Sequence, residues 1–426
     1  MMSADPTPPV TAASTRAFRA APGCDAMLES VSSDSVLQTA QAQMDDAVEL
    51  RRRLHRRPEL GLQNPVTQEA IVDALDGLGT ELTTGTGTTS VVAVMDGDQP
   101  GPTLLLRADM DGLPMHEDTG LDFASTIDDA MHACGHDAHV AMLVSAAKVL
   151  HERRGDIAGR IAFAFQPGEE GHHGARVMLE EGLLDGKDAP AAAFAIHITP
   201  TIPSGWIATK PGSFMASADV LRITVRGKGG HASMPHQALD PIPVACEIVG
   251  AIQAMVTRTV DAFDPAVVTI ARIEAGTTNN VIPETAQLTG TIRTVSEATR
   301  SLVLDGLRRL AGGIAGAHGA EAEVDIDQGY PVTVNDDGFA AFAEDVARDV
   351  VGDAATVHMA SPVMGAEDFS YWLQRVPGAM VFLGASPGPG PAAPNHSNRM
   401  VLDEAAMATG IAMHTAVALR HLAPSN

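Results

Sequence analysis

Apolar and polar positions follow two different patterns along this chain, and the first is typical of a sheet covered by helices. A helical pattern at 47–57 stops at Pro58, and a second helix is predicted at 66–78. The stretch 137–153 is also predicted to be a helix, with Asp137 as its N-cap. Four short apolar runs, each bounded by Gly, Pro or Asp, are predicted to be buried strands of a parallel or mixed sheet: 90–97, 103–110, 160–168 and 192–200.

From about residue 214 the pattern changes to alternating strands and helices. After residue 330 helices return, followed by one more apolar strand at 379–384 and a closing helix from about Asp403. The intervening segments have the order strand, helix, strand, strand, helix, strand, which is the split βαβ order of a ferredoxin-like domain. They lie at 220–230, 243–258, 267–276, 285–294, 296–316 and 322–330.

The two patterns divide the chain into three segments. The N-terminal residues 1–23 are rich in Pro, Ala, Ser and Thr and lack the continuous apolar core of a secretory signal. We expect the ordered part to begin near residue 40. The sequence therefore predicts a tail at 1–40, an α/β domain built from 41–213 and 331–426, and an α+β domain inserted at 214–330.

Composition restricts the classes of partner. Asp plus Glu is 53 and Lys plus Arg is 28, so the formal net charge is −25. A surface of that sign repels phosphate backbones and anionic membranes, so neither nucleic acid nor membrane is expected as a partner. No apolar run approaches the ~20 residues of a membrane span. The three cysteines, Cys24, Cys134 and Cys246, are too few for a disulfide framework, which favours a reducing, cytoplasmic compartment.

The segment 131–139 is the richest in metal-binding side chains. It reads MHACGHDAH, and Cys134 and His136 lie just after a loop, at the start of a predicted helix. Thiolate and imidazole ligands suit Zn²⁺, Mn²⁺, Co²⁺ or Ni²⁺. The alternative is a set of solvated histidines beside one buried cysteine, but the density of donors favours a metal site. The donors are His132, Cys134, His136 and His139.

A pair of glutamates, Glu169 and Glu170, follows the predicted strand at 160–168. Adjacent side chains at a strand end point in different directions, so one can bind a metal while the other works as a general acid and base. A metal-dependent hydrolase needs this division, because the attacking water loses a proton and the leaving amine gains one. A solvated Glu-Glu pair is the ordinary alternative.

Other candidate side chains also follow strand ends. His197 lies at the carboxyl end of an apolar strand, where open α/β sheets bind ligands, although a histidine there is more often a core residue. Asp109 and Asp111 follow another strand and could equally form a turn. His396 lies in a loop after the last strand.

The predicted insertion contains three polar candidates. His231 lies in the glycine-rich segment GKGGHASMPH, which is not a phosphate loop because its lysine precedes the glycines. Asn280 lies in GTTNNVIPE. Arg293 ends a predicted strand, where a guanidinium can hold a substrate carboxylate through two hydrogen bonds; its alternative is a surface ion pair.

Taken in order, these segments resemble the metallopeptidase-clan family of aminoacylases, hippurate hydrolases, auxin-conjugate amidohydrolases and N-acetyldiaminopimelate deacetylases. The resemblance implies a zinc-exopeptidase-like α/β catalytic domain with an inserted α+β ferredoxin-like domain that acts as a lid or dimerisation domain. It also implies a homodimer or homotetramer. The matching motifs span about residues 50–420: LHRRPELG, LRADMDGLP, MHACGHDAH, QPGEEG, AIH, GKGGHASMP, NVIPE, GTIRT, GAEDFSYW and HSN.

Carried over position by position, the resemblance implies two divalent metal ions, Mn²⁺ or Zn²⁺ first, with Co²⁺ or Ni²⁺ as alternatives. It makes Glu169 the general base and His231 a residue that binds substrate and stabilises the oxyanion, in some relatives from the neighbouring subunit. Asn280 and Arg293 match substrate-binding positions. The implied metal ligands are Cys134, His136, Glu170, His197 and His396.

The chain departs from the family pattern at a few positions. Distant relatives have a His-x-Asp ligand motif where this chain has Arg107-Ala108-Asp109. Cys134 is the natural replacement for that histidine, and Asp109 is expected to lie behind the ligands. Gly112 stands where Ala is usual, and His172-His173 stand where small residues are common.

The expected activity is metal-dependent hydrolysis of the amide bond of an N-acyl amino acid or a related small conjugate, giving a carboxylic acid and a free amino acid. A dipeptidase or aminopeptidase of the same clan is one alternative, and a non-catalytic binding protein on the same scaffold is another. A thiol hydrolase using Cys134 and His136 is a third, although residues two apart are a poor nucleophile–base pair. The acyl group, the amino acid, the native metal and the oligomeric state stay open.

Overall fold

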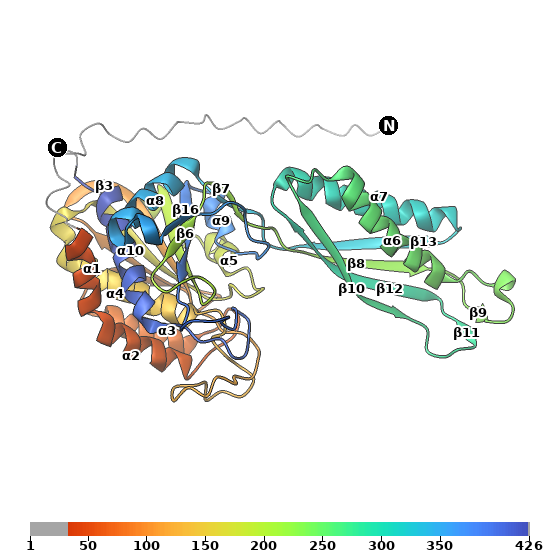
Figure 1. Cartoon of the computed structure of the whole chain (residues 1–426), viewed down its shortest axis with the longest axis horizontal. Helices are drawn as coiled ribbons and strands as arrows, with labels where there is room; N and C mark the ends of the chain where they lie inside the picture. Colours follow the sequence, from red (N-terminus) through yellow and green to blue (C-terminus); the bar gives the residue numbers. More distant parts are fainter. Residues whose placement is uncertain (1–32, 425–426) are drawn as a thin grey trace.

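The computed structural model describes residues 33–424 (Figure 1). Residues 1–32 of the tail predicted at 1–40 lie outside the described part of the chain. Helix α1 spans Ser33–Ala42, so the prediction that order begins near residue 40 is wrong. Val36 and Ala40 of this helix are buried in the core of the first part of the molecule. The sequence pattern missed α1 because it is short and follows a segment rich in small polar residues.

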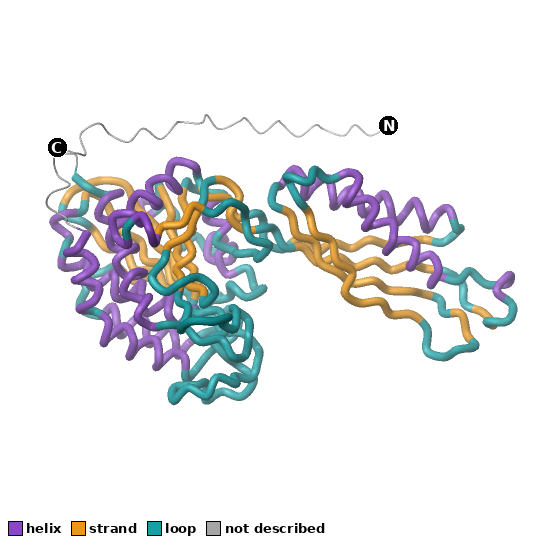
Figure 2. Tube along the Cα trace, in the orientation of Figure 1, coloured by secondary structure: helices purple, strands orange, loops and turns teal. Residues whose placement is uncertain are grey.

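A mixed sheet of eight strands lies at the centre of the first part (Figure 2). Its order is β1-β2-β4-β3-β5-β16-β6-β15. The central strands β4, β3, β5 and β16 run parallel, while β2 and β6 are antiparallel to their neighbours β4 and β16. The strands are β1 Glu81–Thr84, β2 Val91–Asp96, β3 Gln99–Asp109, β4 Ala158–Gln166, β5 Ala192–Thr199, β6 Ile207–Thr209, β15 Thr356–His358 and β16 Gly378–Gly384.

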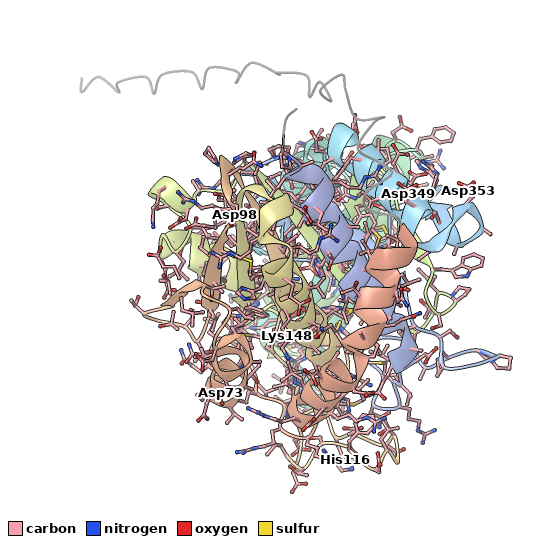
Figure 3. The ribbon with its side chains drawn as sticks, turned by 90° about the vertical axis from the view of Figure 1, so that its left-hand side faces the viewer. Asp73, Asp98, His116, Lys148, Asp349 and Asp353 are labelled. Carbon is pink, nitrogen blue, oxygen red and sulfur yellow. The ribbon has the colours of Figure 1, made fainter. Side chains whose placement is uncertain are left out.

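Helices cover both faces of this sheet. One face packs against α1 and five longer helices: α2 Met44–His55, α3 Pro65–Leu75, α4 His136–Glu152, α8 Asp337–Val351 and α10 Met407–His421. The other face packs against α5 (Gly174–Glu180) and α9 (Ser370–Leu373). Seen from the side of the first set (Figure 3), Lys148 of α4 and Asp349 of α8 lie toward the viewer. Among residues 33–424, no helix has both the length and the apolarity that crossing a bilayer requires.

Asp137 does not cap helix α4, which corrects the sequence prediction. The helix begins one residue earlier, with Gly135 as N-cap in the left-handed region at φ 88°. The Asp137 carboxylate is buried and accepts hydrogen bonds from Arg51 Nε (3.0 Å) and His55 Nδ1 (2.8 Å), both on α2. These partners are distant in sequence, so local capping rules could not find them.

The second part of the molecule is a four-stranded antiparallel sheet with two helices on one face (Figure 1). The elements follow the predicted order of strand, helix, strand, strand, helix, strand. The sheet order is β10-β12-β8-β13, and no helix of the described residues covers the opposite face. The elements are β8 Asp219–Arg226, α6 Pro241–Thr259, β10 Ala266–Ala275, β12 Thr285–Thr294, α7 Glu297–Ala317 and β13 Glu321–Gln328.

Two short strand pairs complete the fold. The predicted strand at 220–230 is interrupted after Arg226, and Gly230–His231 form β9, which pairs with β11 (Val281–Ile282) in a separate sheet. Strand β7 (Gly212–Met215) pairs with β14 (Thr333–Asn335) where the chain passes between the two parts. The β9–β11 pair lies at the end of the second part that is farthest from the first (Figure 1).

Candidate metal centre

Neighbouring parallel strands bring most of the candidate donors to one edge of the eight-stranded sheet. Strands β4, β3, β5 and β16 all end at this edge, because they run parallel. Asp109 ends β3, and His197 lies near the end of β5. Glu169 and Glu170 follow β4, and helix α4 begins there with His136. The carboxyl edge of such a sheet is where ligands of α/β proteins bind.

One donor group consists of Cys134, His136 and His197, whose ligand atoms lie within 4.8 Å of one another. Cys134 Sγ is 3.4 Å from His197 Nε2. His197 Nδ1 donates to the Ile198 carbonyl oxygen (2.9 Å), and His136 Nδ1 donates to the Asp111 carbonyl oxygen (2.8 Å). Both Nε2 atoms are therefore left with a lone pair. That of His136 is buried and has no hydrogen-bond partner in the described part of the chain, as expected of a metal ligand.

A second donor group consists of Cys134, Glu170 and His396, again within 4.8 Å of one another. His396 Nε2 lies 3.2 Å from Glu170 Oε1. The His396 backbone is in the left-handed region at φ 66°, and its N–H donates to the Ala133 carbonyl oxygen (2.7 Å), which fixes the loop beside Cys134. Cys134 belongs to both groups, so its sulfur lies where it can contact two ions.

Asp111 orients three residues of these groups. Its two carboxylate oxygens accept the backbone N–H groups of Glu169 (3.0 Å) and Glu170 (3.1 Å). Its carbonyl oxygen is the acceptor for His136. This one residue therefore fixes both the glutamate pair and the tautomer of His136.

The Asp109 carboxylate is already hydrogen-bonded to neighbouring side chains, so we do not count it among the metal ligands. It accepts hydrogen bonds from His139 Nδ1 (2.5 Å) and Arg107 Nη1 (2.5 Å), and it lies 3.6 Å from His136 Nε2. Burial opposes its charge, but Arg107 and the two histidines hold the pKa of Asp109 well below the ordinary value. His139 Nε2 accepts from the Ile198 N–H (2.7 Å), so both nitrogens of His139 are used and it is not free to bind a metal.

Glu169 lines the pocket but is buried, with 6 % of its surface exposed, and its carboxylate lies within 4.8 Å of ligand atoms of His136 and Glu170. Burial is the largest cause that raises the pKa of Glu169 well above its ordinary value, and the nearby carboxylates of Glu367 and Glu170 add to it. The Tyr330 hydroxyl donates to the Glu169 carbonyl oxygen and accepts from the Gly171 N–H (2.7 Å). Burial and the neighbouring carboxylates favour the protonated form of Glu169, so this group binds a proton more firmly than a solvated carboxyl group does.

A buried arginine and its acidic partners had no predicted role. Arg107 Nη2 donates to Glu367 Oε1 (3.0 Å) and Asp368 Oδ1 (2.9 Å), and its Nε donates to Gln166 (3.0 Å). Burial raises the pKa of Glu367 to about 7 and that of Asp368 to about 6, against the opposing effect of Arg107. The sequence signals for this cluster were the arginine, which stands where distant relatives have a ligand histidine, and the matching motif GAEDFSYW, which contains Glu367 and Asp368.

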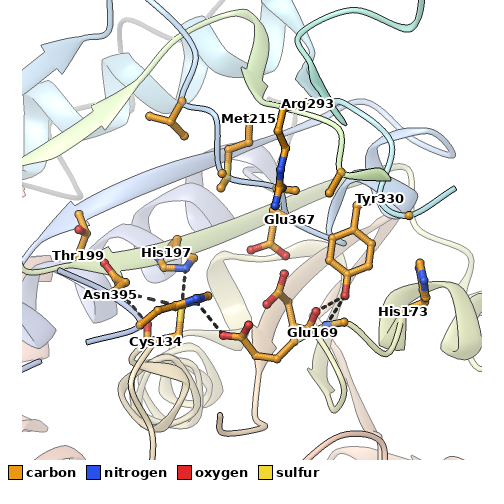
Figure 4. A pocket seen from close by; sticks show the side chains of 18 of the residues that line it. Cys134, Glu169, His173, His197, Thr199, Met215, Arg293, Tyr330, Glu367 and Asn395 are labelled. Carbon is orange, nitrogen blue, oxygen red and sulfur yellow. Dashed lines mark hydrogen bonds and ion pairs between the residues drawn. The ribbon is translucent and has the colours of Figure 1, made fainter. Parts of the chain in front are cut away.

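A pocket of about 660 Å³ opens over these groups (Figure 4). Both parts of the molecule line it: Cys134, Glu169 and His396 come from the first, and Arg293 of β12 comes from the second. Figure 4 shows the Arg293 side chain pointing toward Glu367. Within residues 33–424, its guanidinium forms no hydrogen bond or ion pair. His173, one of the departures from the family pattern, is also part of the pocket wall.

Two predicted substrate-binding residues lie away from this pocket. His231 on β9 is exposed, and so is Asn280, whose carbonyl oxygen accepts the N–H of Ala232 (3.1 Å). Both belong to the far end of the second part (Figure 1). His132, from the donor-rich segment, is buried beside His55 and belongs to neither donor group.

Comparison with known proteins relates this site to metal-dependent hydrolases. The sequence profile of peptidase family M20/M25/M40 matches residues 105–420. Thermostable carboxypeptidase 1 of Saccharolobus solfataricus is 40 % identical over 381 residues, covering 88 % of this chain and 95 % of that protein. N-acetylcysteine deacetylase of Bacillus subtilis is 40 % identical over 340 residues, covering 80 % and 88 %. The structure of a dinuclear metal-binding M20 peptidase from Bacillus subtilis aligns with a TM-score of 0.78 and 35 % identity, covering 90 % and 99 %.

Proposed function

The chain belongs to peptidase family M20/M25/M40, and from this premise we propose that it hydrolyses the amide bond of N-acyl amino acids or related small conjugates. The products are a carboxylic acid and a free amino acid. The observation that carries the proposal is the pair of donor groups that share Cys134, with the buried Glu169 beside them. The relatives named carboxypeptidase and N-acetylcysteine deacetylase both release an amino acid from an amide, so their names agree on this chemistry.

Two divalent metal ions fit the donor atoms. His136 and His197 would hold one ion, Glu170 and His396 the other, and Cys134 would contact both. The orphaned Nε2 of His136 supports this arrangement, because a buried ring nitrogen without a partner is costly unless it binds something. Thiolate and imidazole donors with one carboxylate favour Zn²⁺ or Mn²⁺ over harder cations. When bound, the ions polarise the amide carbonyl and lower the pKa of a coordinated water.

Glu169 is the residue that we propose moves protons. It takes a proton from the attacking water as the water oxygen bonds to the carbonyl carbon. When the C–N bond breaks, it delivers that proton to the leaving nitrogen. A carboxyl group with a raised pKa suits both steps, since it binds the proton firmly enough to accept it and releases it to the more basic amine.

We propose that Arg293 holds the carboxylate of the amino-acid half of the substrate. Its guanidinium lies in the pocket and has no hydrogen-bond or ion-pair partner among residues 33–424 (Figure 4). A guanidinium matches a carboxylate in shape as well as charge, and the pair is stronger where water is excluded. The same contact would favour substrates that end in a free carboxylate.

We further propose that residues 214–330 form a lid and dimerisation domain, whereas 41–213 and 331–426 form the catalytic domain. His231 and Asn280 lie far from the pocket of their own chain, yet the proposed chemistry needs a donor for the oxyanion. A second chain whose β9 reaches over the pocket would supply that donor. The proposed assembly is thus a homodimer, alone or within a homotetramer.

The thiol hydrolase has no support in the geometry. Burial raises the pKa of the Cys134 thiol, which disfavours a free thiolate nucleophile in the absence of a metal. The alternative requires His136 as the base, but its Nδ1 donates to the Asp111 carbonyl oxygen, and Cys134 Sγ also lies 3.4 Å from His197 Nε2. A sulfur that binds metal explains why Cys134 belongs to two donor groups.

Elemental analysis of the purified protein, combined with hydrolysis assays before and after chelation, tests the proposal. About two metal ions per chain are expected, with activity on N-acetyl, N-benzoyl and indole-acetyl amino acids lost on chelation and restored by Mn²⁺ or Zn²⁺. Free dipeptides are assayed in parallel, and faster hydrolysis of these than of N-acyl amino acids would favour the dipeptidase alternative. Metal-loaded, folded protein that hydrolyses none of these amides would contradict the proposed function.

A further inference from the structure

The segment GAEDFSYW places one carboxylate in the pocket that the proposed mechanism does not use. Glu367 lines the pocket, although only 1 % of its surface is exposed. Its Oε1 accepts hydrogen bonds from Arg107 Nη2 (3.0 Å) and from the Phe369 N–H (3.0 Å). Its Oε2 has no hydrogen-bond partner within residues 33–424. Oε1 of Glu367 is therefore held by protein hydrogen bonds, whereas Oε2 can accept a hydrogen bond from a ligand in the pocket.

The position of Glu367 relates this free oxygen to the reacting groups. Carboxylate oxygens of Glu169, Glu367 and Asp368 lie within 4.8 Å of one another. Figure 4 shows the Glu367 carboxyl group between Arg293 and Glu169. A substrate held by Arg293 at its carboxylate, with its amide carbon near the two donor groups, therefore passes its amide nitrogen close to Glu367.

Asp368 differs from Glu367 in its hydrogen bonds and in its position relative to the pocket. It accepts from the same Arg107 nitrogen as Glu367, at 2.9 Å. However, its oxygens also accept from Gln166 Nε2 (2.7 Å) and from the Ala175 N–H (2.9 Å), and it does not line the pocket. Asp368 thus shares the structural role that Glu367 has toward Arg107, but not the exposure to substrate.

A secondary amide presents one N–H group that must find an acceptor when the substrate leaves water. An acceptor in the pocket also fixes the rotation of the amide, so that its nitrogen faces the proton donor when the C–N bond breaks. We infer that Glu367 accepts the N–H of the scissile amide and thereby makes the enzyme selective for secondary amides over esters and tertiary amides. This inference rests on the proposed amide hydrolysis.

The test compares three substrates of similar shape: N-acetylalanine, its ester counterpart O-acetyllactate, and N-acetyl-N-methylalanine. The last two lack the N–H. Values of kcat/KM are measured for the wild type, Glu367→Leu, Glu367→Gln and the matched control Asp368→Asn, each metal-loaded and checked by elemental analysis. The ratio of kcat/KM for the amide to that for the ester is the readout, because a change confined to folding or metal binding affects both substrates alike.

We expect Glu367→Leu to lower this ratio by roughly tenfold to a hundredfold, the effect of one hydrogen bond to a charged acceptor. Glu367→Gln keeps an acceptor oxygen and should lower it less, while Asp368→Asn should slow both substrates and leave the ratio unchanged. If Glu367→Leu does not fold, the wild type alone still provides a test, since it must disfavour the N-methyl amide by at least tenfold.

Two results would overturn the inference. Equal ratios in the wild type, the Glu367 variants and Asp368→Asn would show that Glu367 only balances the charge of Arg107. A wild type that hydrolyses the N-methyl amide as fast as N-acetylalanine would show the same. A wild type with no activity on any of the three substrates would instead count against the proposed function itself, and this inference would fall with it.

Discussion

At the scale of single residues, the proposed chemistry depends most on Glu169. Replacing it by glutamine keeps its size but removes the group that moves protons. We expect Glu169→Gln to retain both metal ions and to lower kcat by about 10²–10⁴-fold, the usual contribution of a general acid and base. Elemental analysis and steady-state kinetics measure the two quantities. The control is Glu180→Gln, at the exposed end of α5, which should change neither. Wild-type turnover in Glu169→Gln would remove Glu169 from its proposed role.

Cys134 is the residue on which both donor groups depend. Cys134→Ser replaces a soft thiolate by a hydroxyl that is a poor ligand at neutral pH, so metal content after dialysis should fall well below two ions per chain. Cys246→Ser is the matched control, because Cys246 is an exposed cysteine on α6. Unchanged metal content in Cys134→Ser would exclude the sulfur as a ligand.

Arg293 is expected to recognise the carboxylate of the substrate. Arg293→Ala should lower kcat/KM about tenfold to a hundredfold for N-acyl amino acids but leave it nearly unchanged for the corresponding carboxamides, which have no charge to lose. Arg272→Ala provides the control, since Arg272 on β10 is exposed and pairs with Glu274. Equal losses on both substrate classes would contradict a carboxylate-binding role.

Residues of the site could be predicted from the sequence where they lie in a recognisable local motif. The HACGHD segment concentrates donors, Glu169 and Glu170 follow an apolar run and the Pro167-Gly168 turn, and His197 lies near the carboxyl end of an apolar strand. Arg107 and Glu367 could not be paired in this way, because 260 positions separate them and the motifs that contain them do not show that they are in contact. Only the folded sheet brings them together, so the hydrogen bond between Arg107 and Glu367 could not be predicted from the sequence pattern.

At the scale of elements, strands and helices with strong periodicity were predicted well, whereas their ends depend on distant partners. The order of the six elements from β8 to β13 follows directly from alternation and amphipathic spacing. The start of α4 does not, because Asp137 is drawn into the core by Arg51 and His55 of α2 rather than capping its own helix. The contact between α2 and α4 is a tertiary one, and it carries a testable consequence.

His55 links α2 to the start of α4 as a buried, charged histidine. Burial disfavours its charge, but Asp137 and Glu117 accept from its two ring nitrogens and raise the pKa of His55 to about 9. Because the folded-state pKa is raised, this stabilisation is complete below the unfolded value of about 6.5 and is lost as pH rises through about 9. We expect the free energy of unfolding to fall by at most about 3 kcal/mol across this window.

Chemical denaturation of the metal-loaded protein between pH 6 and pH 10 measures this loss. His55→Gln should lower stability at pH 6 and flatten the dependence above it. His318→Gln, which removes an exposed histidine paired with Glu247, should leave the curve unchanged. A His55→Gln variant whose pH dependence matches the wild type would show that the loss comes from other groups.

At the scale of the whole molecule, the proposed site is incomplete within one chain. The pocket joins both parts through Arg293, yet His231 lies at the opposite end of the second part (Figure 1). Sequence motifs identified His231 but could not show this separation, because motif order carries no information on how two domains are placed. The separation has two physical solutions: closure within a chain or contribution from a second chain.

Mixing two inactive variants distinguishes these solutions. Glu169→Gln lacks the proposed base and His231→Ala the proposed oxyanion donor, so each homodimer should be nearly inactive. If a second chain supplies His231, a mixed dimer regains one complete site, made of Glu169 from the His231→Ala chain and His231 from the Glu169→Gln chain. Statistical mixing at equal concentrations should then restore about a quarter of wild-type activity.

Separately purified variants are unfolded, mixed and refolded with metal, and each variant refolded alone gives the background. Closure within one chain predicts no recovery above that background, because no chain in the mixture carries both residues, and that result would exclude the shared site.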